Sequence, residues 1–193
     1  TPLPGSQNHR WLALSPAAFT PALTSLVTLR TSQGLNPLVV ELQTIYDHFD
    51  DGRPTPHAIR AYLEQAYNTW PTKPEYVVLV GDASYDPRQH LAFSPASYVP
   101  PFFKVIFEGE ITSDNQYVNL GGDILPEMHI GRLPVNSLEE TQTVVDKIVG
   151  YETSGSQTWQ MGATFVAGAA DGAGDFPTNN ARLGNIIGAP YTA

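Results

Sequence analysis

Short apolar segments alternate with longer amphipathic ones along most of the chain, and this alternation predicts its fold. Residues 10–15, 38–42 and 76–80 read as strands, and "EMHIGRLP" and "MGATFVAGAA" read as further ones. The segment "YVVLV" is apolar at every position, as expected for a strand that is covered on both faces. Strands that alternate with helices form a parallel sheet between two helical layers. The sequence therefore predicts an α/β fold, a three-layer parallel sheet flanked by helices.

Capping residues predict where the helices begin. Ser15, with a proline behind it, predicts a helix that stops at Gly34, and Thr55 predicts a second start of the same kind. Ser137 and Glu140 have the spacing of a capping box ahead of another helix. The helix after Thr55 has apolar residues at helical spacing, which predicts one buried face: Ile59, Tyr62, Leu63, Ala66 and Tyr67.

The middle and the end of the chain are less regular. Between residues 87 and 122 the helical and strand periodicities are lost, although "KVIFEGEI" has the pattern of a hairpin. After "MGATFVAGAA" comes a glycine-rich loop, "DGAGD", and then a helix. The stretch 153–158, "TSGSQT", is the best candidate for a linker.

The composition is that of a folded domain and narrows the class of partner. The chain has 193 residues, of which 41% are hydrophobic and 15% charged, which argues against disorder. Its formal net charge of -9, from 10 Lys+Arg against 19 Asp+Glu, disfavours nucleic acid and anionic membranes as partners. We find no apolar run long enough to span a bilayer. Cysteine is absent, which excludes disulfides, thiolate zinc sites and a cysteine nucleophile within this chain.

Acidic residues at the ends of predicted strands are the first candidates for chemistry. Open parallel sheets bind ligands at the carboxyl ends of their strands, and Asp82 and Asp171 follow such strands. Asp123 and Glu127 lie four apart in a loop that opens with glycines. Carboxylates and the carbonyls between them are the ligands that calcium prefers. The spacing allows a cation site of Asp82, Asp123 and Glu127; the alternatives are a turn role for Asp82 and a solvated acidic loop.

The remaining motifs do not support other kinds of functional site. "GAADGAGDF" lacks the GxGxxG order of a dinucleotide loop, and its acidic residues would repel a pyrophosphate. Ser84 lacks the G-x-S-x-G elbow of a hydrolase. A receiver-like or flavodoxin-like domain with Asp82 as phosphoacceptor needs an acidic pair after the first strand, which "LALSPAAF" lacks. The histidines are scattered, without the spacing of metal ligands: His9, His48, His57, His90 and His129.

Several segments, taken in order, resemble the gingipain-type cysteine peptidases: "IYDHFDDGRPTPHAIRAYL", "YVVLVGDASYDPR", "TSDNQY", "DILPEMHIGRLPV" and "VVDKIVGYE". The likeness runs from about Arg10 to about Gly188. It implies a caspase-like, gingipain-like fold, with 1–157 as the first α/β subdomain and 158–193 as the truncated start of the second. It also implies the N-terminal portion of an endopeptidase whose catalytic histidine and cysteine lie further on.

The resemblance implies a structural calcium in the first subdomain. Its implied ligands are side-chain carboxylates and backbone carbonyls: Asp82, Asp123 and Glu127, with Leu120 and Leu125. Asp171 would support the downstream catalytic histidine. Where arginine-specific members carry an aspartate that reads the substrate, this chain has Asn179 and Asn180, which makes arginine specificity doubtful.

The partners implied by the resemblance are a polypeptide substrate of the complete enzyme and the remaining C-terminal part of the peptidase domain. The implied setting is extracellular or at the cell surface. The alternative is a non-catalytic peptidase-like module, used for binding or docking in a secreted or secretion-associated protein. The two differ in whether the parent protein carries the catalytic histidine and cysteine.

Overall fold

The computed structural model describes residues 8–107, 109–123, 125–155 and 157–188. The chain divides into two compact units, the first ending at Val149 and the second beginning at Gly150. Helix α4 (Leu138–Thr153) crosses this division. The subdomain boundary between 157 and 158 that the sequence suggested stays a prediction, and the two units are described separately.

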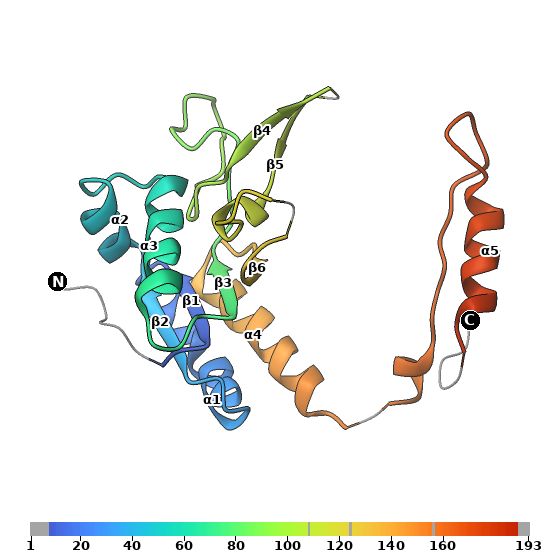
Figure 1. Cartoon of the computed structure of the whole chain (residues 1–193), viewed down its shortest axis with the longest axis horizontal. Helices are drawn as coiled ribbons and strands as arrows, with labels where there is room; N and C mark the ends of the chain where they lie inside the picture. The colour runs from blue at the N-terminus through green and yellow to red at the C-terminus, as the bar shows by residue number, and fades with distance from the viewer. Residues whose placement is uncertain (1–7, 108, 124, 156, 189–193) are drawn as a thin grey trace. The chain divides into compact units, whose positions relative to one another are not determined.

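A four-stranded parallel sheet forms the centre of the first unit (Figure 1). The strand order is β2-β1-β3-β6 and every pairing is parallel. The strands are β1 (Trp11–Ser15), β2 (Pro37–Glu41), β3 (Tyr76–Val80) and β6 (His129–Leu133). The parallel sheet predicted from the alternation of segments is confirmed.

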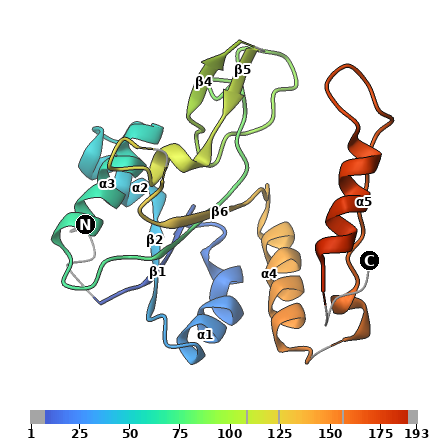
Figure 2. The ribbon, with the colours of Figure 1, turned by 45° about the vertical axis from the view of Figure 1, so that its right-hand side comes forward.

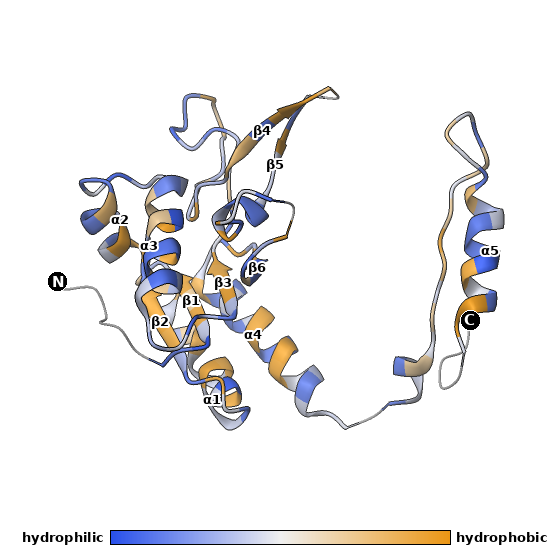
Figure 3. Ribbon diagram, viewed as in Figure 1, coloured by the Kyte–Doolittle hydropathy of each residue, from blue (hydrophilic) through white to orange (hydrophobic). Residues whose placement is uncertain are grey.

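Helices cover both faces of this sheet, which produces the three predicted layers (Figure 2). On one face lie α2 (Leu42–Phe49) and α3 (Pro56–Thr69); on the other lie η1 (Thr20–Leu23), α1 (Thr24–Ser32) and α4. Successive residues of β3 belong alternately to the two cores: Val77 and Leu79 to one, Val78 and Val80 to the other. A strand between two apolar layers needs apolar residues at nearly every position. The central strands β1 and β3 are accordingly largely apolar, with Ser15 as a buried polar residue at the end of β1 (Figure 3).

The predicted helix starts are confirmed at α3 and α4 and wrong at Ser15. The Thr55 hydroxyl accepts from the Ala58 amide at 3.3 Å, and the Ser137 hydroxyl accepts from the Glu140 amide at 3.1 Å. Ser15 instead donates to the neighbouring carbonyl of Pro16, and turns precede η1. The strand predicted over 38–42 runs one residue into α2, which begins at Leu42, and the sequence pattern does not predict this helix.

A β-hairpin stands apart from the sheet in the first unit (Figure 1). Its strands, β4 (Phe103–Ile106) and β5 (Gly109–Thr112), pair antiparallel, as the sequence predicted, and η2 (Asp114–Tyr117) follows. The hairpin is exposed although it is largely apolar, with Val105 at 80% and Phe107 at 100% exposure. It therefore contributes little to the core of the unit.

The second unit contains η3 (Thr158–Met161) and α5 (Phe176–Ile186). The predicted final helix is confirmed, and Asp175 caps it by accepting from the Thr178 amide at 3.1 Å. The strand predicted over "MGATFVAGAA" is wrong: these residues form no strand, and Val166 is 87% exposed. A strand needs a neighbour for its hydrogen bonds, and the described part of this unit offers none.

Candidate functional site

The carboxyl ends of β3 and β6 are joined by backbone hydrogen bonds. The amides of Gly81 and Asp82 donate to the carbonyls of Leu133 and Val135 at 2.9 and 3.0 Å. Gly81 has φ of 132°, and a Cβ there would lie 2.7 Å from the Cβ of Tyr98. Glycine is therefore required where the chain turns out of β3 into the predicted site.

Arg132 is the residue that organises this end of the sheet. From β6 its guanidinium donates to both carboxylate oxygens of Asp114, at 2.9 and 2.7 Å, and to the carbonyls of Gly81 and Val99, each at 3.0 Å. Burial acts to lower the pKa of Arg132, but the hydrogen bonds and charge of Asp114 outweigh it and the pKa is raised. Sequence reasoning missed this residue, although an arginine inside a strand segment, "HIGRL", is a usable signal.

Asp82 takes the role of a turn residue in this structure. Its half-buried carboxylate accepts from the amide of Ala83 at 2.8 Å and from the side-chain amide of Asn136 at 3.4 Å. Its carbonyl accepts from the amides of Tyr98 and Val99. Asp82 thus links β3 to the segments that follow β6 and precede the hairpin.

Asp86, four residues on, is buried beneath the loop that follows β3. Its carboxylate accepts from the amide of Leu91 at 2.8 Å, and this bond is the main reason why the pKa of Asp86 is lowered. The hydroxyl of Ser84 accepts from the amide of Asp86 at 3.1 Å and lies 3.2 Å from the hydroxyl of Ser94. These contacts give Ser84 a structural role in the loop.

The predicted acidic loop is closed by its own carboxylates. Glu127 accepts from the amides of Leu120 and Gly121, at 2.5 and 2.8 Å. Asp123 accepts from the amide of Leu125 at 2.8 Å, and its carbonyl accepts from the side chain of Asn119. The four predicted ligands of this loop therefore form a local network of two separate pairs, Glu127 with Leu120 and Asp123 with Leu125.

The structure does not bring Asp82 into that network. Across the ranges that the structure describes, no group of three or more His, Cys, Asp or Glu residues is placed to hold a metal ion. The Glu127 oxygens each have a lone pair beyond the amide bond that they accept, so their contacts leave them able to coordinate. The calcium site stays a prediction.

Asp171 and the paired asparagines lie in the second unit. Asp171 is exposed, accepts from the amide of Ala173 at 2.8 Å, and closes a tight bridge with Gly174. Asn179 and Asn180 lie on α5. No histidine lies in residues 150–193, so the support of a catalytic histidine by Asp171 stays a prediction.

Comparisons with known proteins agree on one family. The sequence model of Peptidase family C25 matches residues 5–192. Gingipain R2 of Porphyromonas gingivalis (strain ATCC BAA-308 / W83) is 26% identical over 175 residues, covering 89% of this chain and 21% of its own length. The chain therefore spans about a fifth of the length of this curated relative.

Solved structures show the same fold. The Arg-specific cysteine proteinase gingipain R (RgpB) matches 96% of this chain and 40% of its own, with a TM-score of 0.66 and 23% identity. The complex of the P. gingivalis RgpB pro- and mature domains matches 92% of this chain and 38% of its own, with the same TM-score and identity. Dimeric latent PorU from P. gingivalis matches 77% of this chain and 16% of its own, with a TM-score of 0.64 and 25% identity.

These matches confirm the gingipain-like, caspase-like fold that the sequence predicted. Among the described helices, none has the length and apolar character needed to cross a membrane. The family match extends over nearly the whole sequence, and the parallel sheet with helices on both faces agrees with it. The chain belongs to Peptidase family C25 and resembles part of a gingipain peptidase domain.

Proposed function

We propose that this chain is the N-terminal portion of the catalytic domain of a gingipain-type cysteine endopeptidase. The observation that supports this most strongly is the family match over residues 5–192. The chain has no cysteine, so the thiol nucleophile of such an enzyme would come from elsewhere in the complete protein. The family resemblance implies that the catalytic histidine would come from there as well. The substrate class is polypeptide.

The proposed partner of this portion is the remaining C-terminal part of the peptidase domain. The segment 162–170 has the composition of a strand but no strand partner in the described part of its unit. Extended apolar backbone of this kind is completed by pairing with another strand. We place the complete protein outside the cell or at the cell surface, an assignment that rests on family likeness alone.

The test is peptide hydrolysis by the complete parent protein, with and without iodoacetamide, beside the 193-residue chain alone. The proposal predicts cleavage by the parent that alkylation abolishes, and no cleavage by this chain. A folded parent that binds peptides but cleaves none would instead support the non-catalytic docking module.

We further propose that the carboxylates of Asp82, Asp123 and Glu127 bind calcium, with the carbonyls of Leu120 and Leu125 as additional ligands. Support comes from the two hydrogen-bonded pairs of this loop and from the oxygen-rich donor set that calcium prefers. A bound ion would tie the loop before β6 to the end of β3 and so stabilise the folded chain.

Thermal unfolding in calcium and in chelator tests this second proposal. An ion bound only by the folded state adds about 2.7 kcal/mol at roughly a hundredfold excess over Kd. The variant Asp123→Asn should lose most of this gain, whereas Asp146→Asn, an exposed acid on α4, should keep it. Identical melting curves in calcium and chelator would refute calcium binding and leave the peptidase proposal untouched.

A further inference from the structure

This acidic chain concentrates its positive charge beside the hairpin. Its net charge is -9, with 10 Lys+Arg in all. Four of these, Arg53, Arg60, Arg88 and Lys104, line two neighbouring cavities of the first unit, together with His57. We call the four arginine and lysine residues the cationic strip. A charge distribution so uneven creates a local potential opposite in sign to that of the whole molecule.

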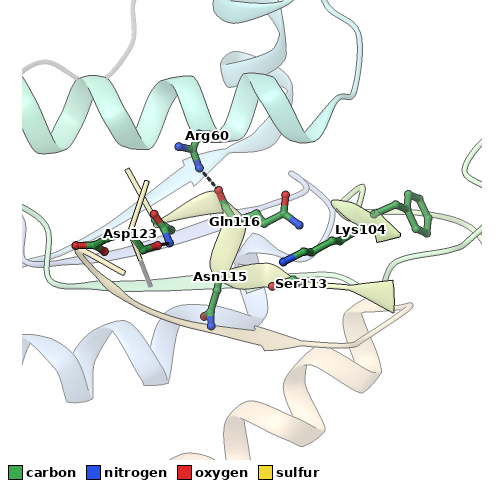
Figure 4. Close-up of a pocket in the computed structure, with 8 residues that line it drawn as sticks. Arg60, Lys104, Ser113, Asn115, Gln116 and Asp123 are labelled. Carbon is green, nitrogen blue, oxygen red and sulfur yellow. Dashed lines mark hydrogen bonds between the residues drawn. The ribbon is translucent and has the colours of Figure 1, made fainter. Parts of the chain in front are cut away.

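The first cavity, of about 500 Å³, lies between α3, β4 and η2 (Figure 4). Arg60 reaches it from α3 and donates to the carbonyl of Gln116. Lys104 extends from β4 toward the turn that carries Asn115 and Gln116, as Figure 4 shows. Asp123 is the acidic residue among the described residues of its lining. The cavity thus combines positive charge with side-chain amides that can donate hydrogen bonds.

The second cavity, of about 610 Å³, combines positive charge with apolar walls. Arg53, His57 and Arg88 are its titratable lining residues within the described ranges. Prolines make up much of the remaining surface: Pro54, Pro56, Pro87, Pro100 and Pro101. Phe103 lines both cavities, so the two adjoin at this residue. Proline has no amide donor, so these five prolines contribute apolar surface without backbone donors.

Most of this positive charge is not neutralised within the described chain. Arg10 and Arg132, outside the strip, form ion pairs with Glu75 and Asp114. Within the strip Arg53 pairs with Asp50. For Arg60, Arg88 and Lys104 the described carboxylates provide no ion pair. These three cations therefore have no carboxylate partner among the described residues: Arg88 and Lys104 are exposed, and Arg60 is half-buried and bonded to a carbonyl.

We propose that the cationic strip binds an acidic, extended polypeptide segment. Carboxylates of the segment would pair with Arg60, Arg88 and Lys104, and an apolar side chain between them would pack on Phe103 and the proline walls. A nucleic acid would place many phosphates against a molecule of net charge -9, whereas a short acidic peptide places its charges only at the strip. This proposal is independent of the peptidase proposal.

Fluorescence anisotropy of the 193-residue chain with labelled peptides tests the proposal. The probe is a fluorescein-labelled peptide of alternating Glu and Leu, and a Lys and Leu peptide of equal length is its charge control. The double variant Arg88→Gln, Lys104→Gln removes two exposed cations. Lys147→Gln, an exposed cation on α4, is the matched control. Each single variant is measured as well, with circular dichroism to verify folding.

We expect the acidic peptide to bind the native chain more tightly than the basic peptide does. Its affinity for the double variant should be at least about fivefold lower, and its affinity for Lys147→Gln should be unchanged. Binding should weaken further between roughly 0.05 M and roughly 0.5 M salt. Equal affinity for both peptides, or for the double variant and the native chain, would overturn the proposal. Two further results would overturn it: binding of inorganic phosphate but of neither peptide, or self-association of the chain that the double variant abolishes while neither peptide binds.

Discussion

Replacing Arg132 by methionine removes the contacts that join β6, β3 and η2. The guanidinium makes four hydrogen bonds, two to the Asp114 carboxylate and two to the carbonyls of Gly81 and Val99. Methionine keeps most of the apolar stem and therefore its packing. The substitution leaves a carboxylate without its partner and two carbonyls without a donor, so the chain should fold but unfold more easily.

The size of the loss follows from burial. Breaking a fully buried ion pair costs about 3–5 kcal/mol, because the remaining charge is left unpaired. The Arg132 side chain is 12% exposed and that of Asp114 is 29% exposed. Water can reach the remaining carboxylate in part, which places the expected loss at the lower end, at about 3 kcal/mol. For a chain of this size that corresponds to a fall of roughly 6–12 °C in Tm.

Thermal and urea unfolding of the native chain, Arg132→Met and Arg10→Met measure this loss. Arg10 also forms a bidentate pair, with Glu75, but the two side chains are 40% and 43% exposed. Exposed pairs contribute little to stability, so Arg10→Met should change Tm much less. Equal falls in Tm for the two variants would refute the role assigned to Arg132.

Further substitutions test the local geometry by thermal unfolding. Gly81→Ala should cost about 2 kcal/mol or more, because its Cβ meets Tyr98 at a positive φ, whereas Gly131→Ala, with open space around it, should be nearly neutral. Asp86→Asn should lower Tm at pH 7 and match the native chain at low pH. The pKa of Asp86 is lowered from 3.8 in the folded chain, so its contribution is complete above that value and is lost as pH falls from there through the lower pKa of the folded chain. A native-to-variant difference independent of pH would contradict this. Thr55→Ala should cost about 1 kcal/mol through loss of the α3 cap, and Thr55→Ser should restore it.

The sheet could be predicted because its determinants are local. The continuous apolar run of β3 and the proline behind Thr55 specify a covered strand and a helix start without knowledge of the rest. The strand expected over 161–170 failed for the opposite reason. Its apolar composition is that of a strand, but a strand forms only where another strand pairs with it. Whether such a partner is present depends on residues elsewhere in the chain.

The sequence identified the residues of the predicted cation site but not the contacts that they make. Asp82, Asp123 and Glu127 stood out because acidic residues at strand ends and in glycine loops are visible in sequence. Spacing could not show that the Glu127 carboxylate would bond the amides of Leu120 and Gly121. The cationic strip could not be predicted from the sequence for a related reason. Its residues come from separate loops, from α3 and from β4, and only folding brings them to adjoining cavities.

Hydrogen exchange of the amides of residues 162–170, in the isolated chain and in the complete parent protein, tests the central claim most directly. If this chain is the first portion of a larger family C25 catalytic domain, these amides should exchange rapidly in the isolated chain and become strongly protected in the parent, where a neighbouring strand pairs with them. Equally rapid exchange in both proteins would show that nothing completes this segment, and would contradict the account.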